Sequence, residues 1–221
     1  MAIFLLVTIV AFLALSVTSI QENVSKEVGE STFKGCFALL KDRVILLSFL
    51  GIICHVGLDV GINVTAPKLL MERLGMTLEG AGLATSVYFL FRTIGCFSGA
   101  FLLACLPPKR VFAASVLMMF IATIGLFTQQ SQMALYVCIA LIGLGNSNIF
   151  PMLLSRAMLH LPERKNEVSG LMIMGLFGGT VFPMVMGIAS DASGSQMGAI
   201  AVFAVGVIYL LCMIPVLNKE A

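Results

Sequence analysis

Long apolar stretches separated by short polar segments dominate the sequence. A helix needs about 20 residues to cross a hydrocarbon core of about 30 Å. The stretches are continuous rather than alternating at every second residue, so they indicate helices and not the strands of a membrane barrel. The pattern predicts an all-α membrane protein with seven transmembrane helices, at Ala2–Ile20, Val44–Ala66, Ala81–Leu106, Val111–Thr128, Met133–Ser155, Val168–Ala189 and Met197–Leu217.

The composition agrees with this interpretation. Hydrophobic residues make up 59% of the 221 residues and charged residues 11%, with a mean hydropathy of +1.06. A soluble domain has about 25% charged residues, so the composition excludes an ordinary soluble enzyme and a protein that binds nucleic acid through a basic face. The cysteines show no Cys-x-x-Cys spacing, and no cofactor or metal ion is expected.

The polar segments divide the chain into three parts. Residues 1–20 are expected to form the first helix, residues 21–43 the only long hydrophilic connection, and residues 44–221 six tightly connected helices. The first stretch lacks a basic leader and a clear small-residue cleavage site, so it is expected to be a retained span rather than a signal peptide.

Lysine and arginine are distributed unequally between the two sides of the membrane. Ten lie in the first, third and fifth connections and the carboxyl-terminal tail, whereas the opposite side holds only Lys68 and Arg73. Because cytoplasmic loops are enriched in these residues, the tail is expected in the cytoplasm and the amino terminus outside. The expected location is the plasma membrane, or the inner membrane of a bacterium.

Only two charged residues, Asp59 and Arg92, fall inside the predicted spans. A charge at the bilayer centre costs about 2.5–3.5 kcal/mol on insertion scales, so each should face protein or water. His55 and Asn63 lie one helical turn on either side of Asp59, which places three polar groups on one helix face. Tyr88 lies one turn before Arg92. The residues predict a lined cavity, an Asp59–Arg92 ion pair, or both at different stages of a transport cycle.

A second polar segment interrupts the fifth span at mid-depth. It contains Asn146 and Asn148, whose amides can bind neutral hydroxyl groups, and Pro151, which removes a backbone donor. Pro183 predicts a further helix break in the sixth span. When the last six helices are divided into two sets of three, polar residues lie on the first helix of each set. That placement is typical of the midplane site between inverted repeats in a transporter.

Four motifs resemble the fucose permease and glucose/galactose transporter branch of the major facilitator superfamily. The run from His55 to Asn63 resembles the seventh helix of that branch, with Asp59 where glutamate is common and His55 where tyrosine is common. Phe91-Arg92-Thr-Ile-Gly95 resembles the eighth helix, with Phe91 in place of a glycine, and Asn148-Ile-Phe-Pro151 resembles the tenth. A fourth run has the residue spacing of the eleventh helix, and it contains Gly178, Gly179, Pro183, Gly187, Asp191 and Gly194.

The resemblance covers only the second half of such a transporter, with residues 1–20 as its sixth helix and residues 21–43 as its central cytoplasmic loop. It implies a six-helix carboxyl-terminal bundle, built as a 3+3 inverted repeat, that acts in proton-coupled sugar uptake with a separate amino-terminal half. The residues expected to bind a monosaccharide are His55, Asn63, Tyr88, Arg92, Asn146 and Asn148, and Asp59 is the candidate for proton coupling.

Two alternatives to a working transporter remain at this point. The chain could be a non-transporting fragment that needs a separate first half. A seven-helix receptor would also fit the number of spans and the external amino terminus, although no extracellular domain or sensory output motif is present. A membrane enzyme is not expected, because the spans contain no Ser/His/Asp set and no cluster of metal ligands.

Overall fold

The computed structural model describes residues 9, 12 and 33–219. The predicted span Ala2–Ile20 and most of the connection to Arg43 therefore lie outside the described residues. The continuous described part, from residue 33 onwards, begins with the short helices α2 (Phe33–Ala38) and η1 (Leu39–Lys41).

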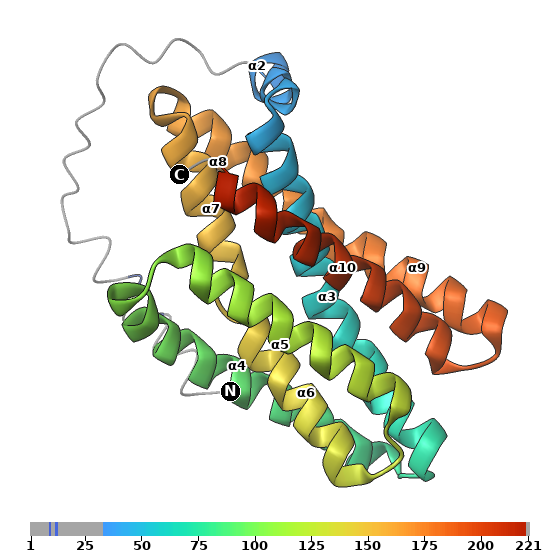
Figure 1. Ribbon diagram of the computed structural model, residues 1–221. Coiled ribbons are helices and arrows are strands. Elements are labelled where there is room, and N and C mark those ends of the chain that lie inside the picture. Colours follow the sequence, from blue (N-terminus) through green and yellow to red (C-terminus); the bar gives the residue numbers. More distant parts are fainter. Residues whose placement is uncertain (1–8, 10–11, 13–32, 220–221) are drawn as a thin grey trace. The chain divides into compact units, whose positions relative to one another are not determined.

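Six helical segments in the described part are long and apolar enough to cross a membrane. They form one bundle with α3 at its centre, in contact with α4, α7, α9 and α10 (Figure 1). This confirms the six spans predicted from residue 44 onwards. The segments are α3 (Arg43–Leu74), α4 (Leu78–Cys105), α5 (Pro108–Thr128), α6 with α7 (Gln132–Asn146 and Ile149–His160), η2 with α8, η3 and α9 (Pro162–Arg164, Lys165–Met174, Gly175–Phe177 and Gly178–Ser193), and α10 (Gln196–Lys219).

The fifth span is interrupted between Asn146, where α6 ends, and Ile149, where α7 begins. Pro151 lies in the first turn of α7, where a missing backbone N–H removes no intrahelical hydrogen bond. In the sixth span, α9 continues through Pro183, and the regular α-helix is interrupted earlier, at Gly175–Phe177. The interruption predicted at Asn146 and Asn148 is therefore confirmed. In the sixth span the interruption lies before Pro183, so the predicted break at that proline is wrong.

Side chains at both ends of α3 fix its neighbours. At the first end, Asp42 accepts hydrogen bonds from the amides of Val44 (2.8 Å) and Ile45 (3.2 Å) and contacts Nε2 of His160 at 3.1 Å. Partial burial raises the pKa of Asp42, but the amide of Ile45 and the His160 ring outweigh it and hold that pKa below its usual value. The carboxylate therefore caps α3 and ties it to the end of α7.

At the other end of α3, Glu72 accepts hydrogen bonds from the hydroxyl of Ser195 (2.5 Å) and the amide of Gln196 (2.7 Å), where α10 begins. Arg73 donates to the carbonyl oxygen of Gln129 at 2.6 Å, just beyond α5. These contacts hold α3 against α5 and α10, which are the last helices of the two sets of three.

The apolar surface is unequally covered. In the most apolar window of α3, 56% of the residues are buried inside the bundle, compared with 17% in α4. Phe97 and Phe101 on α4 are 73% and 77% exposed. In a membrane protein such a surface faces lipid or further helices.

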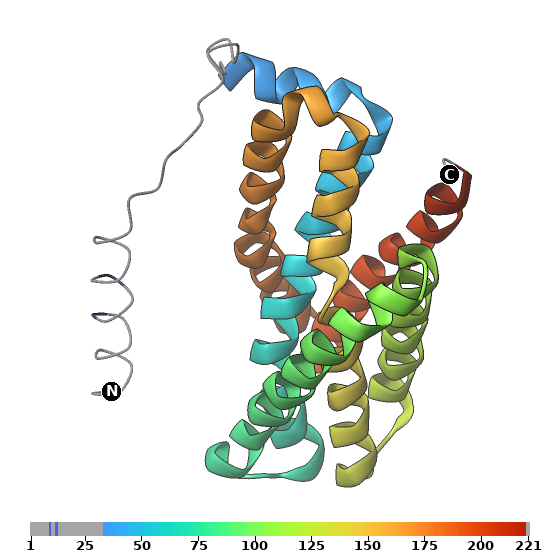
Figure 2. The ribbon, with the colours of Figure 1, turned by 90° about the vertical axis from the view of Figure 1, so that its left-hand side faces the viewer.

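The helices α4 and α7 separate toward the end of the bundle that carries the α4–α5 connection (Figure 2). At mid-depth, by contrast, α4 and α6 approach closely, because small residues line their contact. A Cβ atom at Gly143 would lie 2.6 Å from the carbonyl oxygen of Tyr88. This close approach places Tyr88 and Arg92 of α4 next to the polar end of α6.

Replacing Gly143 with alanine should lower the free energy of unfolding by about 1–3 kcal/mol, because the added methyl group meets rigid backbone of α4. Gly187→Ala is the matched control, since a Cβ there meets nothing within 4 Å. Unfolding in mixed micelles measures both. Equal stability of the two variants would show that the close approach of α4 and α6 is unimportant.

Candidate functional site

The site is built on one face of α3, where i, i+4 spacing aligns His55, Asp59 and Asn63. The middle residue of the three receives most of the contacts from the neighbouring helices. Arg92 of α4 donates through one nitrogen to both carboxylate oxygens of Asp59, at 2.5 Å each. The intramembrane ion pair expected from the sequence is therefore formed.

Two further side chains complete the surroundings of the Asp59 carboxylate. The hydroxyl of Tyr88 donates to Oδ1, and the amide nitrogen of Asn146 donates to the same oxygen at 3.2 Å. Three helices, α3, α4 and α6, thus meet at one carboxylate. Charge-assisted hydrogen bonds of this kind are stronger than neutral ones, so Asp59 is the centre of the network.

Asn146 connects this carboxylate to His55. Its amide nitrogen also donates to the hydroxyl oxygen of Tyr88 at 2.9 Å, and its Oδ1 lies 2.8 Å from Nδ1 of His55. Because the amide oxygen can only accept, Nδ1 of His55 carries the hydrogen in this arrangement. The orientation of the Asn146 amide therefore fixes the histidine tautomer.

The network has a buried layer and an accessible layer. His55, Tyr88 and Asn146 are 2%, 1% and 0% exposed. The side chains of Asp59 and Arg92 are 17% and 28% exposed. A solute that reached this face would meet the ion pair first, and the three buried groups would orient the pair from behind. The aromatic face of Tyr88 is covered in this conformation.

The two remaining asparagines expected from the sequence behave differently. Asn63 donates to the backbone carbonyl of Asp59 at 2.7 Å, and its Oδ1 is buried without a hydrogen-bond partner. Asn148 donates to the carbonyl of Gly95 and the hydroxyl of Ser147, both at 2.8 Å. The Oδ1 of Asn63 therefore has no partner in this conformation, whereas Asn148 fastens the α6–α7 interruption to α4.

Two residues that were not among the expected site residues support this arrangement. Ser147 lies in the interruption and accepts from Asn148, and Thr85 of α4 donates to the backbone carbonyl of Asn63 at 3.4 Å. The only signal for the first contact is the glycine pair Gly95 and Gly99, which lets α4 approach the interruption. The described residues contain no group of three metal-binding side chains.

Comparison with known proteins gives the same family as the sequence motifs. The family model of the major facilitator superfamily matches residues 45–221. Similar curated proteins include the putative glucose/galactose transporter of Helicobacter pylori strain J99, 22% identical over 86% of this chain and 45% of the relative. The glucose/galactose transporter of Brucella abortus biovar 1 is 26% identical over 70% of this chain and 38% of the relative. The chain thus spans about half the length, or less, of the curated relatives it matches.

Solved structures show the same architecture. A variant of the Escherichia coli fucose:proton symporter FucP superimposes with a TM-score of 0.85 at 19% identity, over 100% of this chain and 54% of the symporter. FucP in the outward conformation gives a TM-score of 0.78 at 22% identity, over 97% of this chain and 52% of that protein. The match establishes that this chain has the fold of the corresponding half of these proteins.

Proposed function

This chain belongs to the major facilitator superfamily, and from that premise we propose that it forms the carboxyl-terminal half of a proton-coupled sugar transporter. Such transporters work by alternating access, in which two bundles rock around a site at the bilayer midplane. The relatives are named as glucose/galactose transporters and as a fucose:proton symporter. These names support a multi-pass membrane protein that transports a monosaccharide. They favour this function over that of a seven-helix receptor.

The observation that carries the proposal is the accessible Asp59–Arg92 pair at the meeting point of three apolar helices. Ionisable groups within a membrane are costly, and they are retained where a substrate or ion passes. A pair that served only packing would be cheaper as two apolar side chains. Its partial exposure on one face of the bundle supports contact with a solute.

The chemistry of the accessible layer suits a neutral, hydroxyl-rich solute. The Oδ1 of Asn63, one turn from Asp59 on α3, is buried without a partner in this conformation, and it can accept a hydrogen bond from a sugar hydroxyl once a movement of the helices uncovers it. Arg92 offers five donors, of which the contacts with Asp59 use only part. His55, Tyr88 and Asn146 act on the solute indirectly by fixing the pair in place, and Asn148 by holding the interruption against α4.

We assign proton coupling to Asp59. Protonation of this carboxylate removes its charge and weakens its hold on Arg92 and Tyr88, so the three helices are tied together less strongly. A proton shifts the balance between the two conformations of the alternating-access cycle only if it binds one of them more tightly. Asp59 meets this condition if its contacts with Arg92 and Tyr88 differ between the two conformations. The solute can then move with the proton.

The remaining half of the site is assigned to an amino-terminal bundle. The exposed apolar residues on α4, including Phe97 and Phe101, supply a surface for it. The excess of lysine and arginine on one side supports a cytoplasmic tail, an external amino terminus and residence in the plasma membrane. Residues 1–20 and 21–43 are assigned to the sixth helix and the central loop.

Uptake into vesicles tests this function. The chain produced together with a complementary amino-terminal half from the same genome should accumulate labelled glucose, galactose or fucose under an inward proton gradient. Either half alone should accumulate none, because each holds only part of the site. Equal uptake by this chain alone, or no uptake of any hexose by the pair, would contradict the proposal.

A further inference from the structure

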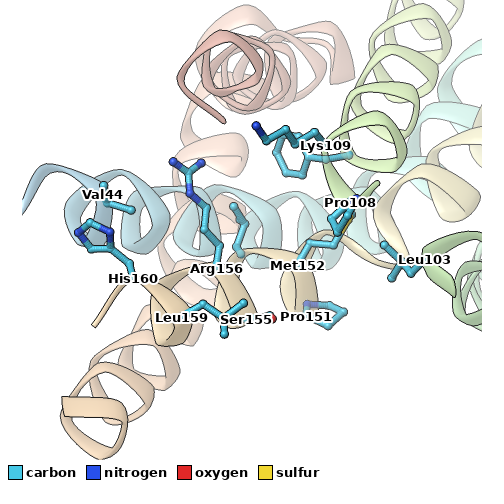
Figure 3. Close-up of a pocket in the computed structure, with 12 residues that line it drawn as sticks. Val44, Leu103, Pro108, Lys109, Pro151, Met152, Ser155, Arg156, Leu159 and His160 are labelled. Atoms are coloured by element: carbon cyan, nitrogen blue, oxygen red, sulfur yellow. The ribbon is translucent and has the colours of Figure 1, made fainter. Parts of the chain in front are cut away.

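A cavity of about 780 Å³ lies between α3, α4, α5 and α7, away from the Asp59 network. It forms where α4 and α7 separate, at the end of the bundle that carries the α4–α5 connection (Figures 2 and 3). None of the residues that contact the Asp59 carboxylate lines it. It is therefore separate from the network around Asp59.

One end of the cavity is basic. Lys109 of α5 and Arg156 of α7 extend toward the same space from opposite walls (Figure 3). His160 lies one turn beyond Arg156 and contacts Asp42 at the rim through Nε2, at 3.1 Å. Arg156 also interacts within the protein, but a guanidinium has five donors and can serve more than one acceptor. Among the described lining residues there is no aspartate or glutamate.

The other end is apolar. Leu103, Phe112 and Met152 form its walls inside the membrane-spanning parts of α4, α5 and α7. On α7, Met152 precedes Arg156 by four residues, which corresponds to about 6 Å along the helix axis. The cavity thus combines two cations with apolar walls, of which Phe112 and Met152 lie one turn further into the membrane-spanning parts of α5 and α7 than Lys109 and Arg156.

This order of charge and hydrocarbon matches a membrane lipid. Basic pockets between transmembrane helices bind anionic headgroups, and the deeper apolar walls fit the first part of an acyl chain. A small soluble anion would contact only the basic end and leave the apolar walls without a ligand. We infer that this cavity binds one anionic phospholipid, with its phosphate between Lys109 and Arg156.

Native mass spectrometry of the full chain in mixed micelles of phosphatidylglycerol and phosphatidylcholine tests the inference. One phosphatidylglycerol should remain bound in preference to phosphatidylcholine. Loss of both cations in K109Q/R156Q should weaken its binding about 25-fold, at about fivefold for each charge. The matched control, R110Q/K165Q, removes the same charge at the same end of the bundle but leaves the cavity lining unchanged.

Ser155→Trp provides a second test without a change of charge, because it adds a bulky side chain to the cavity lining from α7. This variant should also lose phosphatidylglycerol, and it decides the matter if K109Q/R156Q fails to fold. Equal retention of the two lipids would overturn the inference. So would equal loss in the control variant, or displacement of phosphatidylglycerol by glycerol 1-phosphate at the same concentration, which would indicate a site for a soluble anion.

Discussion

Replacing Arg92 with leucine should lower the free energy of unfolding by about 3 kcal/mol, the lower end of the range for breaking a buried ion pair. The cost arises because the Asp59 carboxylate, inside an apolar bundle, loses the donor to both of its oxygens. The lower end applies because the two side chains are 28% and 17% exposed. Tyr88 and Asn146 still donate to Oδ1 and compensate in part.

The double variant D59N/R92L separates loss of the pair from loss of packing. It should recover most of the stability, since replacement of a whole buried pair by uncharged groups is often nearly neutral. Unfolding in mixed micelles, with Arg110→Leu as a control at the end of the bundle, measures these differences. If R92L and D59N/R92L are equally unstable, Arg92 stabilises the bundle by packing and not by neutralising Asp59.

The second large effect concerns transport by the proposed pair of halves. Asp59→Asn should abolish accumulation of sugar under a proton gradient, so that the internal concentration only reaches the external one. A gradient can drive transport only through a group whose charge changes when a proton binds, and an amide does not titrate in this range. Exchange of labelled for unlabelled sugar, which needs no net proton movement, should continue.

Uptake and exchange in the same vesicles distinguish this result from a folding defect. Asn166→Asp is a suitable control, because it changes charge at an exposed position in α8, far along the chain from the site. Undiminished accumulation by the D59N variant would assign coupling to other carboxylates and remove Asp59 from that role.

The sequence predicts the membrane spans and the two exceptional charges because both depend on large local costs. An exposed peptide group or an unpaired charge in hydrocarbon is so unfavourable that continuous apolar stretches must be helices. For the same reason Asp59 needs a partner, and Arg92 is the only basic residue inside the predicted spans. Their contact was therefore predictable without knowing how the helices pack.

The layering of the site was not predictable in this way. Spacing places residues on one face of a helix, but it does not give the rotation of that helix against its neighbours. Tyr88 and Asn146 were expected to meet the solute, and the packing of α4 on α6 buries both. Asn148, two residues after Asn146, turns to Gly95 because the helix is interrupted between them. Their roles toward a solute stay predictions.

The central claim is that this chain carries half of a sugar site around Asp59. Saturation-transfer NMR on the chain in lipid nanodiscs tests it most directly, with D-glucose, D-galactose and L-fucose as ligands. We expect transfer to at least one sugar and a clear loss of transfer in Asn63→Leu, with none in the control Asn166→Leu. Absence of transfer to all three sugars, or equal transfer to the N63L variant and the unchanged chain, would contradict the account.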